Sequence, residues 1–113
     1  MKQYPSILGI SNCPNSKCIA FKKYDGSNLR WEWRRKKGFY KYGTRTRLFD
    51  TSDEIFGKAI QLFFDIYAEY LEKIFIDNRL AEPITSFTEF FGTNSFAGLH
   101  DPKDDMKLML FDV

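Results

Sequence analysis

The sequence predicts an α+β fold in which a mainly antiparallel sheet packs against one long helix. Apolar residues alternate with polar ones along several short segments, which is typical of strands. Along one longer segment they recur every three or four residues, which is typical of a helix. The chain has 113 residues, 43% of them hydrophobic, so we expect residues 1–113 to form one small domain with a buried core.

Two strands are expected in the first third of the chain, at Lys17 to Lys23 and at Asn28 to Arg35. In the second strand every other residue is large and apolar, which predicts that one face is buried. The residues expected on that face are Leu29, Trp31 and Trp33.

A hairpin and the long helix follow. Arg35-Lys-Lys-Gly38 has the composition of a tight turn, because glycine accepts the positive φ that such turns require, and Phe39 to Thr44 would form the return strand. Thr51-Ser-Asp-Glu54 has the spacing of a helix capping box. The apolar stripe behind it predicts a helix from about Ser52 to Phe75.

Two further strands are expected after a helix stop at Asp77-Asn78, one at Ile84 to Phe91 and one at Met106 to Val113. The last strand reaches the end of the sequence without a turn or a tail, which suggests a fragment of a larger protein. Its free edge would pair readily with another strand, so we expect self-association through that edge.

Charge is distributed unevenly along the chain. Lys17 to Arg47 contains 11 Lys or Arg against 2 Asp or Glu, whereas the sequence from Leu48 onward contains 5 against 13. Two solvated faces of opposite sign would explain this pattern. A basic segment interleaved with aromatic residues also suits a polyanion, because cations meet phosphate and aromatic rings stack on bases.

Membrane and metal proteins are not indicated. No apolar run reaches the ~18 residues that a membrane span needs, and no signal peptide is recognisable, so we expect a cytoplasmic protein, in the host cytoplasm if its source is a phage. Cys13 and Cys18 have no histidine at ligand spacing. They are therefore expected to be free thiols, and no residue is assigned to a metal.

Residues 22–27 read KKYDGS and have the composition of a reactive turn. A lysine amine attacks only when it is deprotonated, and neighbouring positive charge disfavours the ammonium form. Asp25 adds a carboxylate, and Gly26 allows the backbone to approach a ligand closely. An ordinary surface turn has a similar composition, so this stretch alone does not decide its role.

Lys23-Tyr-Asp-Gly26 resembles the nucleotide-attachment motif of the covalent nucleotidyltransferases, which include ATP-dependent DNA ligases, RNA ligases and mRNA capping enzymes. Ser27-Asn28 continues the motif in the manner of RNA ligases, especially the phage-like type. Three further segments are similar to later motifs of the superfamily, in the same order and over nearly the whole chain. They are Lys41-Tyr-Gly-Thr-Arg45, Thr88-Glu-Phe-Phe-Gly92 and Leu108-Met-Leu-Phe-Asp-Val113.

The resemblance implies the amino-terminal part of an adenylation domain with a partial, ATP-grasp-like ligase fold. Lys23 would attack the α-phosphate of ATP, with Mg or Mn as the divalent metal, and Lys22 would tune the local charge. Glu89 would bind the ribose hydroxyls, and Phe111 would stack on adenine unless it belongs to the core. Either Arg45 or Arg47 would contact phosphate. The remaining nucleotide-binding candidates are Asp25, Gly26, Ser27 and Asn28.

The expected partners are ATP and RNA or DNA ends. The residues expected to contact nucleic acid are Arg30, Arg34, Arg35, Lys41 and Arg47. His100 is expected to have a structural role.

The superfamily places two more motifs after the Phe-Asp strand, one with a metal-associated glutamate and one with a lysine pair that holds the triphosphate. Neither occurs within the 113 residues, so we expect little adenylate formation by this chain and weak ATP binding.

Other functions fit parts of the sequence. A non-catalytic nucleic-acid-binding module would use the basic hairpin from Asn28 to Arg47 and would not need Lys23. Within the superfamily, a DNA ligase and a guanylyltransferase are the alternatives to an RNA ligase.

Overall fold

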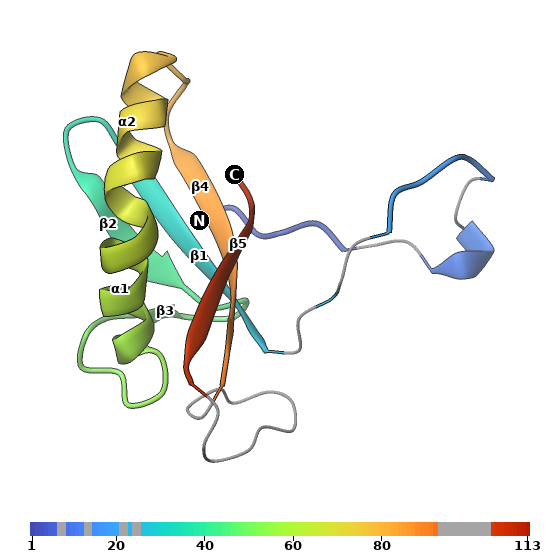
Figure 1. Ribbon diagram of the computed structural model, residues 1–113, viewed down its shortest axis with the longest axis horizontal. Helices are drawn as coiled ribbons and strands as arrows, with labels where there is room; N and C mark the ends of the chain where they lie inside the picture. Colours follow the sequence, from blue (N-terminus) through green and yellow to red (C-terminus); the bar gives the residue numbers. More distant parts are fainter. Residues whose placement is uncertain (7–8, 13–14, 21–22, 24–25, 93–104) are drawn as a thin grey trace.

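The computed structural model describes residues 1–6, 9–12, 15–20, 23, 26–92 and 105–113. It shows the expected α+β arrangement, with one antiparallel sheet in the strand order β3-β2-β1-β4-β5 and a helix across one face of it (Figure 1). The strands are β1 (Ser27–Arg34), β2 (Gly38–Gly43), β3 (Leu48–Phe49), β4 (Ile84–Phe91) and β5 (Lys107–Asp112). The helical segments are η1 (Ile10–Asn12), α1 (Gly57–Phe63), η2 (Phe64–Ala68) and α2 (Glu69–Asp77).

The β1–β2 hairpin confirms the predicted turn. The backbone N–H of Lys37 donates to the carbonyl of Arg34 at 3.0 Å, and Gly38 has a φ of 67°, which a side chain would strain. The register of the two strands shifts next to Glu32. Such a bulge changes which side chains of the return strand face the helix.

The helix is shorter at its start than predicted. It runs through α1, η2 and α2 and begins at Gly57. The prediction of a capping box at Thr51 to Glu54 is therefore wrong. The side chain of Asp53 accepts the backbone N–H groups of Ile55 and Phe56 at 2.9 and 2.8 Å. Those bonds stabilise a turn in place of a first helical turn. The helix ends at Asp77, as predicted.

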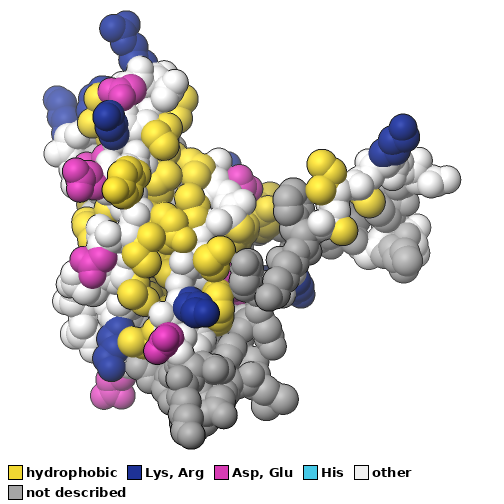
Figure 2. All heavy atoms as spheres, in the orientation of Figure 1, with side chains coloured by type: hydrophobic (Ala, Val, Ile, Leu, Met, Phe, Trp, Pro, Cys, Tyr) yellow, Lys and Arg dark blue, Asp and Glu magenta, His cyan; other side chains and the backbone are white. Residues whose placement is uncertain are grey.

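The core lies between the helix and the sheet. Leu29, Trp31 and Trp33 are buried as predicted. Trp31 stacks on Phe63 of the helix with ring centroids 4.1 Å apart, and its indole N–H donates to Thr88 Oγ1 at 2.8 Å. β1 is therefore the central strand of the core. Figure 2 shows further hydrophobic side chains at the surface, along the helix and between the helix and β5.

The strand predicted at Lys17 to Lys23 is wrong for the residues that the structure describes. Residues 17–20 form no strand and are exposed, and Lys23 is exposed as well. β1, the strand that follows this segment, pairs with β2 on one edge and with β4 on the other, so the segment cannot pair with β1, and residues 17–20 pair with neither outer strand of the sheet. In Figure 1 residues 9–12 and 15–20 lie away from the sheet.

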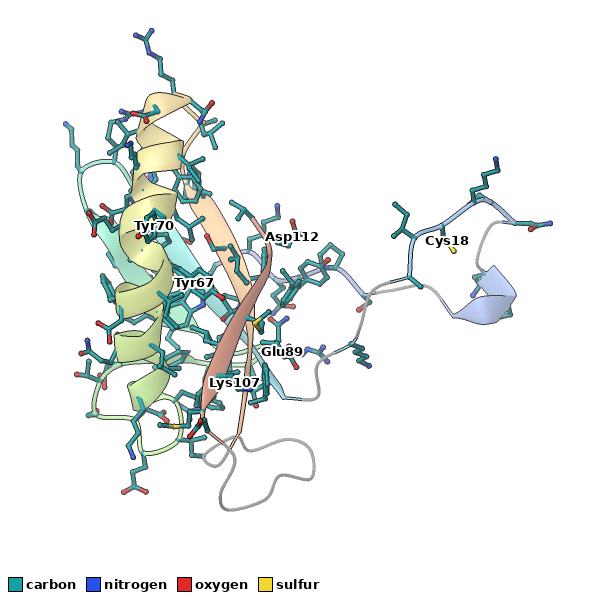
Figure 3. The ribbon with its side chains drawn as sticks, viewed as in Figure 1. Cys18, Tyr67, Tyr70, Glu89, Lys107 and Asp112 are labelled. Carbon is teal, nitrogen blue, oxygen red and sulfur yellow. The ribbon has the colours of Figure 1, made fainter. Side chains whose placement is uncertain are left out.

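The strand predicted at Met106 to Val113 is confirmed as β5, which ends the sheet on the side of β4. Tyr67 links the helix to this strand (Figure 3). Its hydroxyl donates to the carbonyl of Leu108 at 2.8 Å and lies 3.3 Å from the backbone N–H of Leu110. Within the described ranges, no helix has the length and apolar character needed to span a membrane.

Candidate functional site

The face of the sheet that the helix leaves uncovered carries several of the candidate residues. Neighbouring residues that pair across antiparallel strands lie on the same face. Asn28 pairs with Glu89, and Arg30 pairs with Phe87, whereas Trp31 between them faces the helix. Asn28 and Glu89 therefore lie side by side on this face, which we call the open face. Figure 3 shows Glu89 on β4, with Lys107 and Asp112 toward the two ends of the neighbouring β5.

The end of the Lys23 to Gly26 motif is attached to Glu89. The backbone N–H of Gly26 donates to Glu89 Oε1 at 3.1 Å. A carboxylate has lone-pair sites for about four hydrogen bonds, so this bond is compatible with ribose binding. Lys23 is three residues away, which keeps its Cα within about 11 Å of Gly26. Lys22 and Asp25 lie outside the described residues.

Gly26 lies too close to β4 to carry a side chain. A Cβ at this position would lie 2.2 Å from the carbonyl oxygen of Phe90 and 2.8 Å from the Cβ of Phe91. The next residue, Ser27, already pairs with Phe90 as the first residue of β1. Glycine is thus required here by the close approach of two backbones, and this approach brings the motif to Glu89.

Phe111 lies on the open face and not in the core. Met109 pairs with Glu89, and Phe111 lies two residues further along β5, so Phe111 faces the same side as Met109, whereas Leu110 between them packs against the core. Phe111 is 45% exposed, and the centroid of its ring lies 6.4 Å from that of Phe87. An aromatic face at the surface, on the same side of the sheet as Glu89, is available for stacking on a base.

The structure separates the two candidate phosphate-binding arginines. The guanidinium of Arg47 bonds to the carboxylate of Asp53 and lies 5.6 Å from the ring centroid of Phe56. Arg45 is exposed and lines a small hollow on the open face, together with Asn28. The geometry therefore favours Arg45 over Arg47 for a phosphate contact.

The residues expected to contact nucleic acid have different surroundings. Arg34 and Arg35 are exposed at the hairpin turn, and Lys41 forms an ion pair with Glu32 at 3.5 Å. Arg30 is 5% exposed, and its guanidinium donates to the carbonyls of Met1, Lys2 and Thr44. Arg30 thus binds the chain's own backbone. Because its side chain is buried, little of it is exposed for contact with a polyanion.

The hairpin carries a buried carboxylate next to the basic residues. Glu32 accepts a short hydrogen bond from the hydroxyl of Tyr40, and Lys37 and Lys41 lie 4.8 and 5.4 Å from the centre of the Tyr40 ring. Burial of Glu32 opposes its ionisation, but the hydrogen bond from Tyr40 and the ammonium of Lys41 outweigh it. The pKa of Glu32 is therefore lower than its ordinary value.

Replacing Tyr40 by phenylalanine is expected to destabilise the fold by about 1–3 kcal/mol at pH 7, because Glu32 loses a buried donor. Since folding lowers the pKa of Glu32, its carboxylate stabilises the folded state above its ordinary pKa of 4.5. That contribution is lost as the pH falls through the lower pKa of the folded state. Urea unfolding should show the difference from the wild type at pH 7 and a smaller one at pH 3. Tyr70→Phe, at an exposed tyrosine of α2, is the control, and an equal loss at both pH values would contradict the assignment.

The contact between the first residues of the chain and the sheet was not predicted from the sequence. Tyr4 packs against Phe87 and Phe111, with ring centroids 5.0 and 5.2 Å apart. No local pattern in the sequence predicts that this segment returns to the sheet. His100 and Cys13 lie outside the described residues, whereas Cys18 is a free, exposed thiol as predicted. The described residues contain no group of three His, Cys, Asp or Glu side chains that could hold a metal ion.

Comparison with protein-family models, with curated proteins and with solved structures found no match for this chain. The interpretation of the site therefore depends on its motifs and on its geometry.

Proposed function

We propose that this chain is the amino-terminal part of a nucleotidyltransferase of the ATP-dependent RNA ligase type. The observation that carries the proposal is the hydrogen bond from Gly26 to Glu89, which joins the first and third motifs at one place on the open face. The two motifs are 63 positions apart in the sequence. Their contact is what a shared nucleotide site requires.

In the proposed reaction the neutral amine of Lys23 attacks the α-phosphorus of ATP. A nitrogen–phosphorus bond forms, the bond from the α-phosphorus to the oxygen that bridges to the β-phosphate breaks, and the amine gives up one proton, so that pyrophosphate leaves and AMP remains on Lys23. The AMP then passes to a 5′-phosphate end, and attack by a 3′-hydroxyl seals the strand and releases AMP. Glu89 would orient the ribose, Phe111 the adenine and Arg45 a phosphate. A divalent metal would neutralise the phosphates, which commonly supply most of the ligands of Mg²⁺.

Replacing Phe111 by alanine tests the nucleotide site. Stacking of a base on an aromatic ring contributes about 1–3 kcal/mol. The loss of the ring should therefore weaken ATP binding about 5- to 150-fold in a calorimetric titration of the chain. Tyr70→Ala removes an aromatic ring that is 71% exposed on the helix, and it should leave ATP binding unchanged. Equal ATP affinity in Phe111→Ala and the wild type would contradict the assigned role, and a wild-type chain that binds no ATP would contradict the proposed function.

A nucleic-acid-binding module is the second candidate function, because the hairpin turn presents exposed cations next to an aromatic ring. Arg34, Arg35, Lys36 and Lys37 are exposed there, and Tyr40 is partly exposed beside them. Mass spectrometry after incubation with ATP and Mg²⁺ distinguishes the two proposals in a form of the protein that contains the two later motifs, since only the nucleotidyltransferase predicts an AMP adduct there. The edge of β5 remains a proposed place for pairing with a further strand.

A further inference from the structure

The first six residues of the chain are attached to the open face by Arg30. Its guanidinium donates to the carbonyl of Met1 at 3.3 Å and to that of Lys2 at 3.1 Å. The side-chain amide of Gln3 donates to the carbonyl of Arg45 at 3.4 Å. In Figure 1 the N-terminus accordingly lies next to β4. The Nη1 of the buried Arg30 fixes the position of this segment, because this nitrogen would otherwise be buried without partners, as the Nε of Arg30 is.

The segment places Tyr4 against the ring assigned to adenine. The rings of Tyr4 and Phe111 meet at 80°, and those of Tyr4 and Phe87 meet at 68°. Both are edge-to-face contacts, a favoured geometry for aromatic pairs. Burial and the carboxylate of Asp112 raise the pKa of the Tyr4 hydroxyl. The ring of Tyr4 thus contacts Phe111, and its hydroxyl is affected by the carboxylate of Asp112, the residue that follows Phe111.

Phe111 needs such support because of where it lies. It belongs to a strand at the edge of the sheet and stands next to a bulge, so β4 is the strand beside it. A ring that is 45% exposed on an edge strand has few neighbours that restrict its rotamer. The described contacts that restrict it come from Tyr4 and Phe87.

The same segment also borders the other candidate residues. A hollow of about 110 Å³ is enclosed by residues 3–6 on one side and by Asn28, Arg30 and Arg45 on the other. Pockets for drug-sized ligands measure roughly 300–1,000 Å³, so this hollow accommodates a part of a nucleotide. The rest would extend along the open face, where Phe111 is exposed.

We propose that Tyr4 is a positioning residue for the nucleotide site: it holds the ring of Phe111 in the orientation that stacks on adenine. The amino-terminal segment is then a fixed wall of the site and not a loose tail. This inference rests on the proposed nucleotidyltransferase function, and it adds a residue that none of the four motifs contains.

A double-mutant cycle measured with ATP tests this role. The loss of one edge-to-face pair, about 0.5–1.5 kcal/mol, corresponds to a roughly 2- to 12-fold change in a binding constant. Tyr4→Ala should therefore weaken ATP binding about 2- to 12-fold, whereas Tyr4→Phe keeps the ring and should bind as the wild type does. In the Phe111→Ala background, Tyr4→Ala should cause no further loss, because Tyr4 acts through Phe111.

Each other outcome has a definite meaning. Additive losses in the double mutant would show a general structural role for Tyr4 and would overturn the inference. Tighter ATP binding by Tyr4→Ala would overturn it as well, because it would show that the segment covers the site. Unchanged binding by Tyr4→Ala, with the loss in Phe111→Ala intact, would overturn this inference alone. A wild-type chain that does not bind ATP would overturn the proposed function and this inference with it.

Discussion

Replacing Lys23 by alanine is expected to abolish the AMP adduct in a form of the protein that contains the two later motifs. The reaction begins with a bond from the lysine nitrogen to the α-phosphorus, and the methyl group of alanine has no atom that forms it. Incubation with ATP labelled at the α-phosphate, followed by denaturing electrophoresis, should show label on the wild type and none on the variant. In the 113-residue chain itself we expect little label, because groups that stabilise a leaving pyrophosphate contribute factors of ~10² to 10³ each.

Lys22→Ala is the matched control for this experiment. It removes a neighbouring positive charge and leaves the motif lysine in place, so the adduct should be weaker but present. Peptide mapping by mass spectrometry should place the AMP on Lys23. A labelled Lys23→Ala protein would contradict the assignment of the nucleophile. Rapid, stoichiometric and Lys23-dependent labelling of the 113-residue chain would contradict only the expectation that the later motifs are needed.

The parts of the fold that follow from local patterns could be predicted from the sequence. The alternation of Leu29, Trp31 and Trp33 identified the buried face of β1, because side chains on a strand point to opposite faces in turn. The glycine at position 38 identified the hairpin turn, since its φ of 67° is unfavourable for other residues. Ile84 to Phe91 was predicted with the bounds that β4 has. In each case the information lies within a few neighbouring residues.

Other parts depend on contacts between distant segments. The residues around Ile19 have the composition of a strand, but both edges of β1, the strand that follows them, are taken by β2 and β4, and residues 17–20 pair with no other strand. The capping box predicted at Thr51 does not form. Asp53 instead accepts hydrogen bonds from backbone N–H groups and forms an ion pair with Arg47. Propensity thus indicated which residues could form an element, and the topology decided whether they did.

The candidate site shows the same division. Alternation along β4 places Phe87 on the same face as Glu89, and the pairing of Asn28 with Glu89 adds Asn28 to that face. Alternation along β5 also puts Phe111 on the face of Met109, which pairs with Glu89, whereas the bulge that makes Asp112 the partner of Phe87 has no clear signal in the sequence. The contribution of Tyr4 depends on a chain segment that returns to the sheet through Arg30, whose partners are 28 and 29 positions away. Non-local contacts of this kind are what local pattern reasoning misses.

Replacing Gly26 by alanine is expected to damage both the fold and the site. The new Cβ would lie 2.2 Å from the carbonyl oxygen of Phe90, and this oxygen belongs to the backbone of β4, which is paired on both edges. The loop before β1 must therefore move, and the bond from Gly26 to Glu89 must lengthen or break. Overpacking of this kind costs about 1–3 kcal/mol, which urea unfolding can measure.

Gly9→Ala is the matched control, because a Cβ there has no atom within 4 Å. It should leave both the free energy of unfolding and ATP binding unchanged. Gly26→Ala should lower both, since Glu89 would lose the contact that places the lysine motif beside the nucleotide. If Gly26→Ala unfolds at a lower urea concentration but binds ATP with wild-type affinity, the contact between Gly26 and Glu89 serves the fold alone. The nucleotide site would then have to be sought elsewhere on the open face, because the joining of the two motifs would no longer support it.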